Sequence, residues 1–255
     1  IKGKSLASIY KIKILDPACG SGSFLIKAFD ALIEEAKRIK GIRELGYEEK
    51  KNLMLNCIHG VDKDERAVDI CKLNLSLKLA ERGQKLPPLH DNIKCGDSLI
   101  DDKEIVGYKA FKWEEEFKEI MQNGGFDVVI GNPPWGAELD KQELMYLRQS
   151  YDEIIVRMID TFMYFIYRSS KLLKNGGFFG MIIPDTLLYQ NDNKKLREYI
   201  LKNFCIKNVI NLGGNIFEHV NRPSSIIVFN KEKNDSNIVK VADLSHLKEK
   251  FNAIN

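Results

Sequence analysis

Residues 126–136 combine groups that could hold and activate a planar amine. The apolar, β-branched run from Phe126 to Ile130 predicts a buried strand. Asn132-Pro133-Pro134-Trp135 follows almost at once and carries an amide, two prolines and a large aromatic ring. Two prolines fix φ twice and donate no backbone N–H. The loop is therefore stiff, and its carbonyl groups remain available as hydrogen-bond acceptors.

This loop suits an exocyclic amine on an aromatic ring. Such an amine has two N–H donors, and the Asn132 side-chain oxygen and the Pro133 carbonyl are two acceptors. Accepting both hydrogen bonds draws the nitrogen lone pair out of conjugation and toward an electrophile. Trp135 can stack on the ring, a contact worth about 1–3 kcal/mol per base. The structural alternative is a proline-stiffened turn after a core strand, with Trp135 as a packing residue.

A glycine-bearing turn follows the first predicted strand, at Asp-Pro-Ala-Cys-Gly-Ser-Gly-Ser (16–23). The turn lacks the lysine and the spacing of a phosphate-cradling loop, and its position 25 is Leu where a dinucleotide fingerprint has glycine. Asp16 would also repel a pyrophosphate. The turn therefore favours a ligand that carries an ammonium group in place of phosphates.

Two further acidic residues follow the next two predicted strands. Asp62 ends the second strand, where an acidic residue typically accepts hydrogen bonds from ribose hydroxyls. Asp97 lies after the third strand and is placed to accept from an adenine amino group. For Asp62 the alternative is a solvent-facing side chain beside Asp64, which would cap the next helix.

The elements that must position these residues alternate between strands and helices, which predicts an α/β fold. The last two strands have no helix between them, which predicts an antiparallel pair on an otherwise parallel sheet. In the predicted helix 68–79, we expect Ile70, Leu73, Leu77 and Ala80 to cover the sheet. Strands are predicted at 12–15, 57–61, 92–95, 126–131, 178–183, 206–211 and 225–229, and helices at 24–39, 48–55, 68–79, 113–121, 142–150, 159–173 and 196–201.

Composition sets broad limits on function. With 255 residues, 44% of them hydrophobic, the chain can bury a real core, and its length favours one large α/β domain. A net charge of +3 permits a nucleic-acid partner without requiring one. The five cysteines show neither paired nor metal-ligand spacing, which favours reduced thiols in a cytoplasmic protein and no metal site. No signal peptide or membrane span is expected.

Pro184-Asp185 followed by Asp192-x-Lys194 resembles the pattern of metal-dependent nucleases. Those sites hold the second acid and the lysine on a strand, whereas Asp192–Lys194 is predicted to open a helix. We therefore set the nuclease interpretation aside.

Taken in order, five segments resemble the γ-class amino-methyltransferases that make N6-methyladenine in DNA. The long insertion before Asp62 and the tryptophan form of the Asn-Pro-Pro motif are most similar to the methylase part of type IIG restriction-modification enzymes and their phage-defence relatives. The resemblance covers roughly residues 12–230 and implies a seven-stranded, mostly parallel, Rossmann-like sheet with a reversed last strand. The segments are Asp-Pro-Ala-Cys-Gly-Ser-Gly-Ser-Phe (16–24), Gly-Val-Asp (60–62), Gly-Asp-Ser (96–98), Asn-Pro-Pro-Trp (132–135) and Gly-Gly-Phe-Phe-Gly-Met-Ile-Ile-Pro (176–184).

The resemblance also implies S-adenosylmethionine as cofactor and assigns roles to individual residues. It gives Asp62 to the cofactor ribose, Asp97 to its adenine amino group, and Phe217 to the second face of a flipped target base. The methionine end of the cofactor is assigned to Asp16, Ala18, Cys19, Gly20 and Gly22. The catalytic tetrapeptide corresponds to Asn132, Pro133, Pro134 and Trp135.

The sequence departs from the family in two respects. The family has a further cofactor-binding segment before the first strand, and about eleven residues precede it here. A target-recognition domain usually follows the last strand, and this sequence ends at Asn255. We therefore expect residues 1–255 to form the methyltransferase domain alone, with target recognition supplied elsewhere.

The function expected from the resemblance is site-specific methylation of adenine N6 in double-stranded DNA, as part of a restriction-modification system. A fused or separate target-recognition domain and an endonuclease are the expected partners. Two alternatives stay open. The same Asn-Pro-Pro-aromatic loop serves methylation of a glutamine amide in proteins, and a non-catalytic subunit of a restriction or phage-defence complex could retain the fold.

Overall fold

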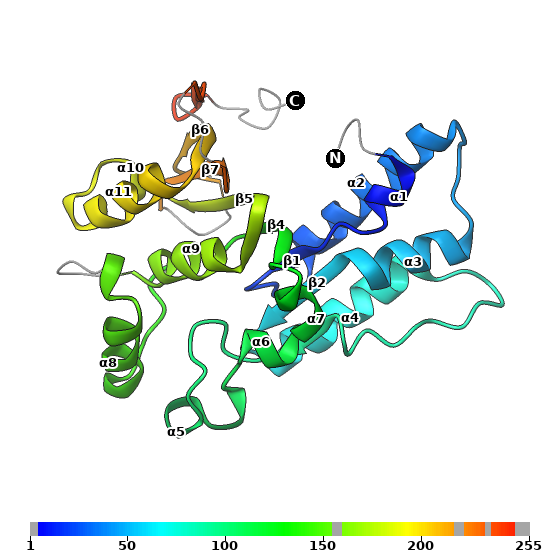
Figure 1. Ribbon diagram of the computed structural model, residues 1–255, viewed down its shortest axis with the longest axis horizontal. Helices are drawn as coiled ribbons and strands as arrows, with labels where there is room; N and C mark the ends of the chain where they lie inside the picture. Colours follow the sequence, from blue (N-terminus) through cyan, green and yellow to red (C-terminus); the bar gives the residue numbers. More distant parts are fainter. Residues whose placement is uncertain (1–4, 155–159, 217–221, 233–235, 248–255) are drawn as a thin grey trace. The chain divides into compact units, whose positions relative to one another are not determined.

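The computed structural model describes residues 5–154, 160–216, 222–232 and 236–247. The chain divides into two compact units, Ile1–Ile130 and Gly131–Asn255, and each is described by itself. Figure 1 shows the elements of both, coloured along the sequence.

The first unit is built on short parallel strands. They are β1 (Ile14–Asp16), β2 (Ile58–Asp62), β3 (Ile93–Cys95) and β4 (Phe126–Gly131), in the order β3-β2-β1-β4. In register, Ile14 of β1 lies opposite Ile58 of β2 on one side and Val128 of β4 on the other. Because all the pairings are parallel, the carboxyl ends of the strands share one edge. Asp16 and Asp62 both lie at that edge.

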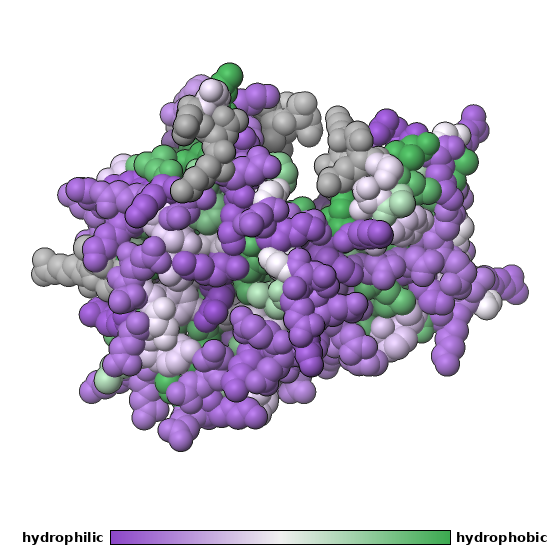
Figure 2. Space-filling view, in the orientation of Figure 1, coloured by the Kyte–Doolittle hydropathy of each residue, from purple (hydrophilic) through white to green (hydrophobic). Residues whose placement is uncertain are grey.

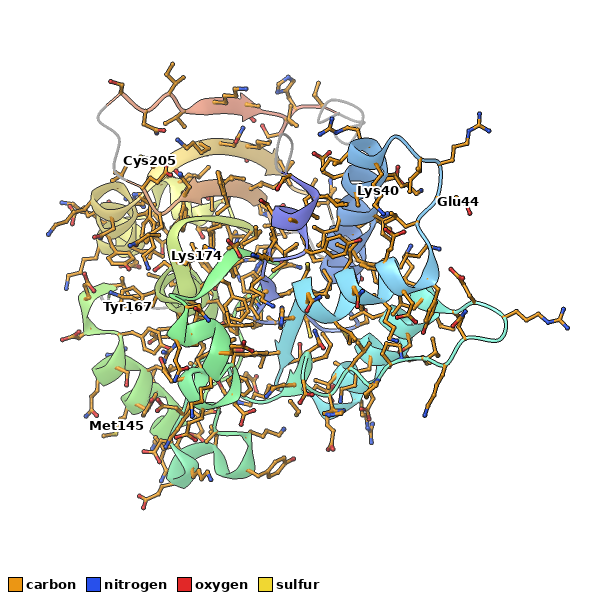
Figure 3. All side chains as sticks on the ribbon, turned by 45° about the vertical axis from the view of Figure 1, so that its right-hand side comes forward. Lys40, Glu44, Met145, Tyr167, Lys174 and Cys205 are labelled. Carbon is orange, nitrogen blue, oxygen red and sulfur yellow. The ribbon has the colours of Figure 1, made fainter. Side chains whose placement is uncertain are left out.

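Helices pack against this sheet or against one another. They are α1 (Leu6–Ile9), α2 (Ser23–Lys40), α3 (Tyr47–Cys57) and α4 (Glu65–Leu79). In α2 the fully buried residues recur at helical spacing, at Leu25, Phe29, Leu32 and Ala36. Lys40, labelled in Figure 3, pairs at the end of α2 with Glu49 of α3. In α3, Tyr47, Leu53, Met54 and Cys57 are buried, so the insertion between α2 and β2 contains a packed helix.

The prediction for the covering face of α4 is wrong. Ile70, Leu73 and Leu77 are 48%, 58% and 61% exposed, and Ala80 is exposed just beyond the helix. The buried face instead carries Val68, Cys71, Leu75 and Leu79. The helix has two apolar stripes, and periodicity alone does not say which one meets α2 and the sheet. Figure 2 shows hydrophobic patches among the polar residues of the surface.

Residues 101–125 hold several short helices: α5 (Lys103–Val106), η1 (Gly107–Lys109), α6 (Trp113–Glu116) and α7 (Lys118–Gln122). The single helix predicted around 113–121 is broken at Phe117, whose φ of −120° and ψ of 46° are not helical. The Phe117 ring packs on Trp113, Phe126 and His59. Burial lowers the pKa of His59 to about 3, so this histidine is a neutral member of an aromatic cluster.

The second unit has a mixed sheet in the order β5-β7-β6-β8. The strand β7 (Ser224–Asn230) runs antiparallel to both β5 (Leu173–Pro184) and β6 (Cys205–Gly213). This confirms the antiparallel pair predicted from the missing helix. A further strand, β8 (Lys240–Asp243), runs parallel to β6, so the described residues form eight strands where seven were predicted. The sequence signal is absent because β8 is a four-residue strand with Val241 73% exposed.

The helices of this unit are α8 (Lys141–Ser150), η2 (Asp152–Ile154), α9 (Thr161–Leu172), α10 (Thr186–Tyr189), η3 (Asn191–Asn193) and α11 (Lys194–Asn203). The aromatic stripe of α9, which includes Phe162 and Phe165, is buried as core. Figure 3 labels Tyr167 of α9 and Cys205 at the start of β6. Asp192 lies in η3 and Lys194 begins α11, so the second acid and the lysine of the nuclease-like pattern are on helices and not on a strand.

Metal clusters and long apolar helices do not occur in the described part of the chain. No group of three or more His, Cys, Asp or Glu side chains is arranged to hold a metal ion there. None of the helices in the same residues is long and apolar enough to cross a membrane. The five cysteines are free thiols, four of them buried.

Gly22 makes a testable prediction about the packing of α2 on α4. Its φ is +89°, and a Cβ there would lie 2.7 Å from Cys71 Sγ. We expect Gly22→Ala to lower the free energy of unfolding by about 1–2 kcal/mol through backbone strain and by about 1–3 kcal/mol more through overpacking. The control Gly83→Ala has φ of +83° and open space around it, so only the strain remains. Urea denaturation compares the two, and equal losses would show that Cys71 yields without cost.

Candidate active site

Asp16, the last residue of β1, is a buried carboxylate at the start of the glycine loop. It is 1% exposed, and its Oδ1 accepts a hydrogen bond of 3.1 Å from Ala18 N. Burial, and to a smaller extent the nearby charge of Asp62, raise the pKa of Asp16 to about 7. No lysine or arginine of the described residues forms an ion pair with it. A cationic group bound here would therefore find a buried carboxylate to face.

Asp62 closes the loop that follows β1. Its Oδ2 accepts a hydrogen bond of 2.7 Å from Gly20 N, and its Oδ1 accepts one of 2.9 Å from Asp64 N. Asp64 caps α4 by accepting from Arg66 N at 2.9 Å. The capping role predicted for Asp64 is thus confirmed, but Asp62 is a structural partner of the glycine loop and not merely solvent-facing.

Glycines in the loop 16–23 allow unusual backbone angles and leave space beside the backbone. Gly20 has φ of +50°, and a Cβ there would meet no atom within 4 Å, so open space lies beside the backbone. Cys19 N donates to Val61 O at 3.0 Å, and Ser98 Oγ donates to Pro17 O at 2.6 Å. These bonds tie the loop to the ends of the neighbouring strands. Ala18, in the same loop, is half-buried.

Asp97 follows β3 and is 7% exposed. Its Oδ1 accepts from Leu99 N at 3.0 Å and Ile100 N at 3.2 Å, while its Oδ2 lies 3.1 Å from Lys63 Nζ. The sequence did not predict the pairing with Lys63. An amino group that binds Asp97 would share the carboxylate with this lysine.

The hydrogen-bond acceptors at this edge fit the cofactor that the resemblance implies. S-adenosylmethionine carries an ammonium group and ribose hydroxyls, and the edge presents the carboxylates of Asp16, Asp62 and Asp97 beside an open glycine backbone. Carboxylates accept hydrogen bonds from both kinds of group.

In the second unit, the tetrapeptide 132–135 follows β4 in the chain and presents free acceptors. Asn132 Oδ1 is buried and has no hydrogen-bond partner among the described residues. Within the same residues, the Pro133 carbonyl accepts no bond, whereas the Pro134 carbonyl accepts one of 2.8 Å from Thr161 Oγ1. Trp135 is partly buried. A buried acceptor without a donor costs free energy, and a ligand with N–H groups would supply the donor.

Side chains from two other places hold the loop that continues from the tetrapeptide. Asp160 Oδ1 accepts from Gly136 N at 2.6 Å, and Thr161 Oγ1 accepts from Ala137 N at 3.2 Å. Arg222 forms an ion pair with Asp160. Sequence analysis missed Asp160 and Thr161. An aspartate before an apolar helical run predicts a helix cap, but the Asp160 side chain makes no cap bond to α9. Phe217, the predicted base contact, lies outside the described residues.

Comparison with solved structures identifies the class of fold. A protein of Listeria monocytogenes, described as a class I S-adenosylmethionine-dependent methyltransferase, matches with a TM-score of 0.58 and 20% identity over 98% of this chain and 65% of that one. The type ISP restriction-modification enzyme LlaGI, in complex with a DNA substrate mimic, matches with a TM-score of 0.74 and 20% identity over 95% of this chain and 22% of that one. The fold is that of a class I S-adenosylmethionine-dependent methyltransferase.

Comparison of sequences identifies the family. The sequence model of the Eco57I restriction-modification methylases matches residues 56–217, and that of an RMKL-like methyltransferase domain matches residues 11–83. The type II restriction enzyme and methyltransferase RM.Eco57I of Escherichia coli is 32% identical over 263 residues, which cover 92% of this chain and 26% of that protein. This chain belongs to the Eco57I restriction-modification methylase family. It spans about a quarter of the length of that relative, and the predicted resemblance is confirmed.

We expect the affinity for the cofactor to depend on pH through the ionisation of Asp16. Its pKa is raised from 3.8 to about 7, so the contribution of the neutral carboxyl group to stability is fully present below pH 3.8 and is lost as the pH rises through 7. An ammonium group needs the ionised form. We therefore expect affinity for S-adenosylmethionine to rise between pH 5.5 and 7.5, and binding at pH 6.5 to release protons.

Calorimetry in two buffers of different ionisation enthalpy measures this proton release. Asp16→Asn should bind about 10- to 100-fold more weakly at pH 7.5, on the scale of one hydrogen bond to a charged group, and should lose the proton release. Proton release that persists in Asp16→Asn would assign the titration to another group.

Proposed function

We propose that residues 1–255, with a core at roughly 12–230, form the methylase part of a restriction-modification protein. In this proposal the chain transfers a methyl group from S-adenosylmethionine to N6 of a flipped-out adenine in double-stranded DNA. The family membership and the DNA-bound relative support a DNA substrate. Target recognition and an endonuclease belong to the rest of the protein or to partner subunits, and the protein acts in the cytoplasm.

The observation that carries this proposal is the pair of free acceptors in the tetrapeptide. The buried Asn132 Oδ1 and the Pro133 carbonyl have no donor among the described residues, and adenine N6 has two N–H groups. Trp135, two residues after Pro133, offers a stacking face for the ring. The Asn-Pro-Pro-Trp sequence thus combines two acceptors with a platform for a planar base.

These residues act by orienting and polarising the amine. Two accepted hydrogen bonds direct the N6 lone pair away from the ring, and the stiff prolines keep the acceptors in place. When bound, S-adenosylmethionine supplies an electrophilic methyl group on a sulfonium. Asp16 would face its ammonium group, Asp62 its ribose and Asp97 its adenine amino group. The chain itself supplies position and electrostatics.

Adenine N6 inside a duplex is paired and out of reach, so the base must leave the stack at a cost of a few kcal/mol. Stacking on Trp135 offsets part of this cost, and Phe217 is proposed to contact the other face of the base. The rest of the catalytic work is then the alignment of the amine with the methyl group.

Methylation of a glutamine amide is the second candidate, because an amide nitrogen also has two N–H donors. The family membership favours DNA over protein as the substrate. Transfer of a labelled methyl group to unmethylated DNA or to a protein extract, tested side by side with the complete protein, separates the two. Label in protein alone would reject the proposal.

Asn132→Ala tests the role of the side-chain acceptor. It removes one of the two groups that hold the amine and leaves Asp16, Asp62 and Asp97 intact. We expect single-turnover methyl transfer to fall by roughly 10²-fold or more, on the scale of losing one preorganised polar group, with little change in cofactor affinity. Asn132→Asp keeps an oxygen acceptor and should lose less. Transfer at the wild-type rate in Asn132→Ala would exclude this loop as the active site.

Trp135→Ala tests base capture separately from chemistry. It removes stacking of about 1–3 kcal/mol and should weaken productive binding of the target adenine more than it slows transfer. A mismatched target adenine leaves the duplex at lower cost and should partly restore activity. Single-turnover rates on paired and mismatched duplexes measure the effect. An equal deficit on both substrates would argue that Trp135 packs against protein and does not stack on the base.

A further inference from the structure

Three side chains from outside the tetrapeptide determine how its loop is held. Asp160 and Thr161 lie at the start of α9, and Arg222 lies two residues before β7. All of them contact the chain between Pro134 and Ala137, either directly or through one another. They are far from the loop in sequence and belong to the same compact unit.

The loop depends on these side chains because its two prolines have no backbone N–H groups with which to form hydrogen bonds. Pro133 and Pro134 have no backbone N–H, so the first donors after Asn132 are Trp135, Gly136 and Ala137. Two of these donors are used by the support: Gly136 N binds Asp160 Oδ1 at 2.6 Å, and Ala137 N binds Thr161 Oγ1 at 3.2 Å. Gly136 has φ of +71°, a conformation that favours glycine. The chain therefore turns sharply where it is held.

Thr161 also selects which carbonyl groups remain available. Its hydroxyl donates to the Pro134 carbonyl at 2.8 Å and so occupies that acceptor. The Pro133 carbonyl and Asn132 Oδ1 keep no donor in the part of the chain that the structure describes. One hydroxyl thus fixes the peptide plane beside the two acceptors that the amine needs.

Arg222 completes the support electrostatically. The Asp160 carboxylate is only 19% exposed, and Arg222 lies on its Oδ2 while Gly136 N lies on its Oδ1. With its charge balanced and both oxygens engaged, Asp160 has one orientation. Arg222 follows directly after residues 217–221, which include the predicted base contact Phe217. The ion pair therefore links the chain just before β7 to the side chain that holds Gly136 N.

We propose that Asp160, Thr161 and Arg222 are positioning residues, which set the orientation of the Asn132 and Pro133 acceptors. This inference rests on the proposed function, because it assigns the acceptors to the amine of a target base. None of the three residues contacts the reacting atoms. Their effect is on the alignment step, after the base has entered the site.

Thr161→Val, with Thr161→Ser as the matched control, tests the hydroxyl. Valine keeps the shape and removes both the donor to Pro134 and the acceptor for Ala137, whereas serine keeps both. In the complete protein, we expect Thr161→Val to slow single-turnover methyl transfer by about 10-fold, on the scale of one buried hydrogen bond. Thr161→Ser should stay within about 3-fold of wild type. S-adenosylmethionine affinity and the fluorescence rise of 2-aminopurine at the target position should be unchanged in both.

A double-mutant cycle with Asp160→Asn and Arg222→Gln tests the ion pair. If the two residues act as one support, each single variant slows transfer by a similar factor and the double variant is no slower than the worse single variant. If the rate losses of the two single variants multiply in the double variant, Asp160 and Arg222 do not act as one support. Arg222→Gln could instead weaken DNA binding and flatten its salt dependence, with an unchanged transfer rate at saturating DNA. That result would make Arg222 a phosphate contact and would also overturn its role as a positioning residue.

The outcomes separate this inference from the proposed function. If wild type does not methylate DNA, or if Asn132→Ala transfers at the wild-type rate, the proposed function fails. If Asn132→Ala is inactive while Thr161→Val and Asp160→Asn keep the wild-type rate, only the positioning role fails. Parallel loss of methyl transfer, cofactor affinity and thermal stability in Thr161→Val would also reject positioning, because it would reduce Thr161 to a general packing residue.

Discussion

The parallel pairing of β1 with β2 on one side and β4 on the other is the constraint on which the strand edge with Asp16 and Asp62 depends. The strand β1 has three residues, and Asp16 lies opposite Gly60 of β2. Asp62 therefore extends two residues further along the same edge, where its carboxylate reaches Gly20 N. A shift of one residue in this register would turn every side chain to the other face and remove that bond.

The edge is built at an electrostatic cost. Asp16 is almost fully buried, and its charge is disfavoured by burial and by Asp62. Among the described residues, the hydrogen bond from Ala18 N is the one contact that favours the charged form. Perturbed carboxyl groups of this kind concentrate at functional sites, because a ligand of opposite charge resolves the conflict. Asp62 and Asp97 differ from Asp16 in that backbone N–H groups or a lysine already occupy their oxygens. The three carboxylates are thus not equivalent.

In the second unit, the loop at 132–135 needs hydrogen bonds from other parts of the chain to fix its conformation. Consecutive prolines supply stiffness but no donors, so the support comes from the start of α9 and from the residue pair Asp160 and Arg222. Asp160 gives up the helix cap that its position would allow, and the loop gains a fixed contact at Gly136. The helix α9 lacks this side-chain cap, and the Asn132 and Pro133 acceptors gain a defined geometry. Such a choice is typical of functional sites.

The sequence by itself determined the α/β class, the acids after the strands, the glycine turn, the Asn-Pro-Pro-Trp loop and the antiparallel strand β7, because apolar runs, turn residues and motifs act over a few neighbouring positions. Only the tertiary structure decided that α4 buries Cys71 and Leu75 and leaves Leu73 and Leu77 exposed, since both stripes have helical spacing. It also decided that Lys63 pairs with Asp97, that β8 joins β6, and that Thr161 holds the Pro134 carbonyl. These features depend on contacts between residues that the local pattern does not connect, and folding alone brings them together.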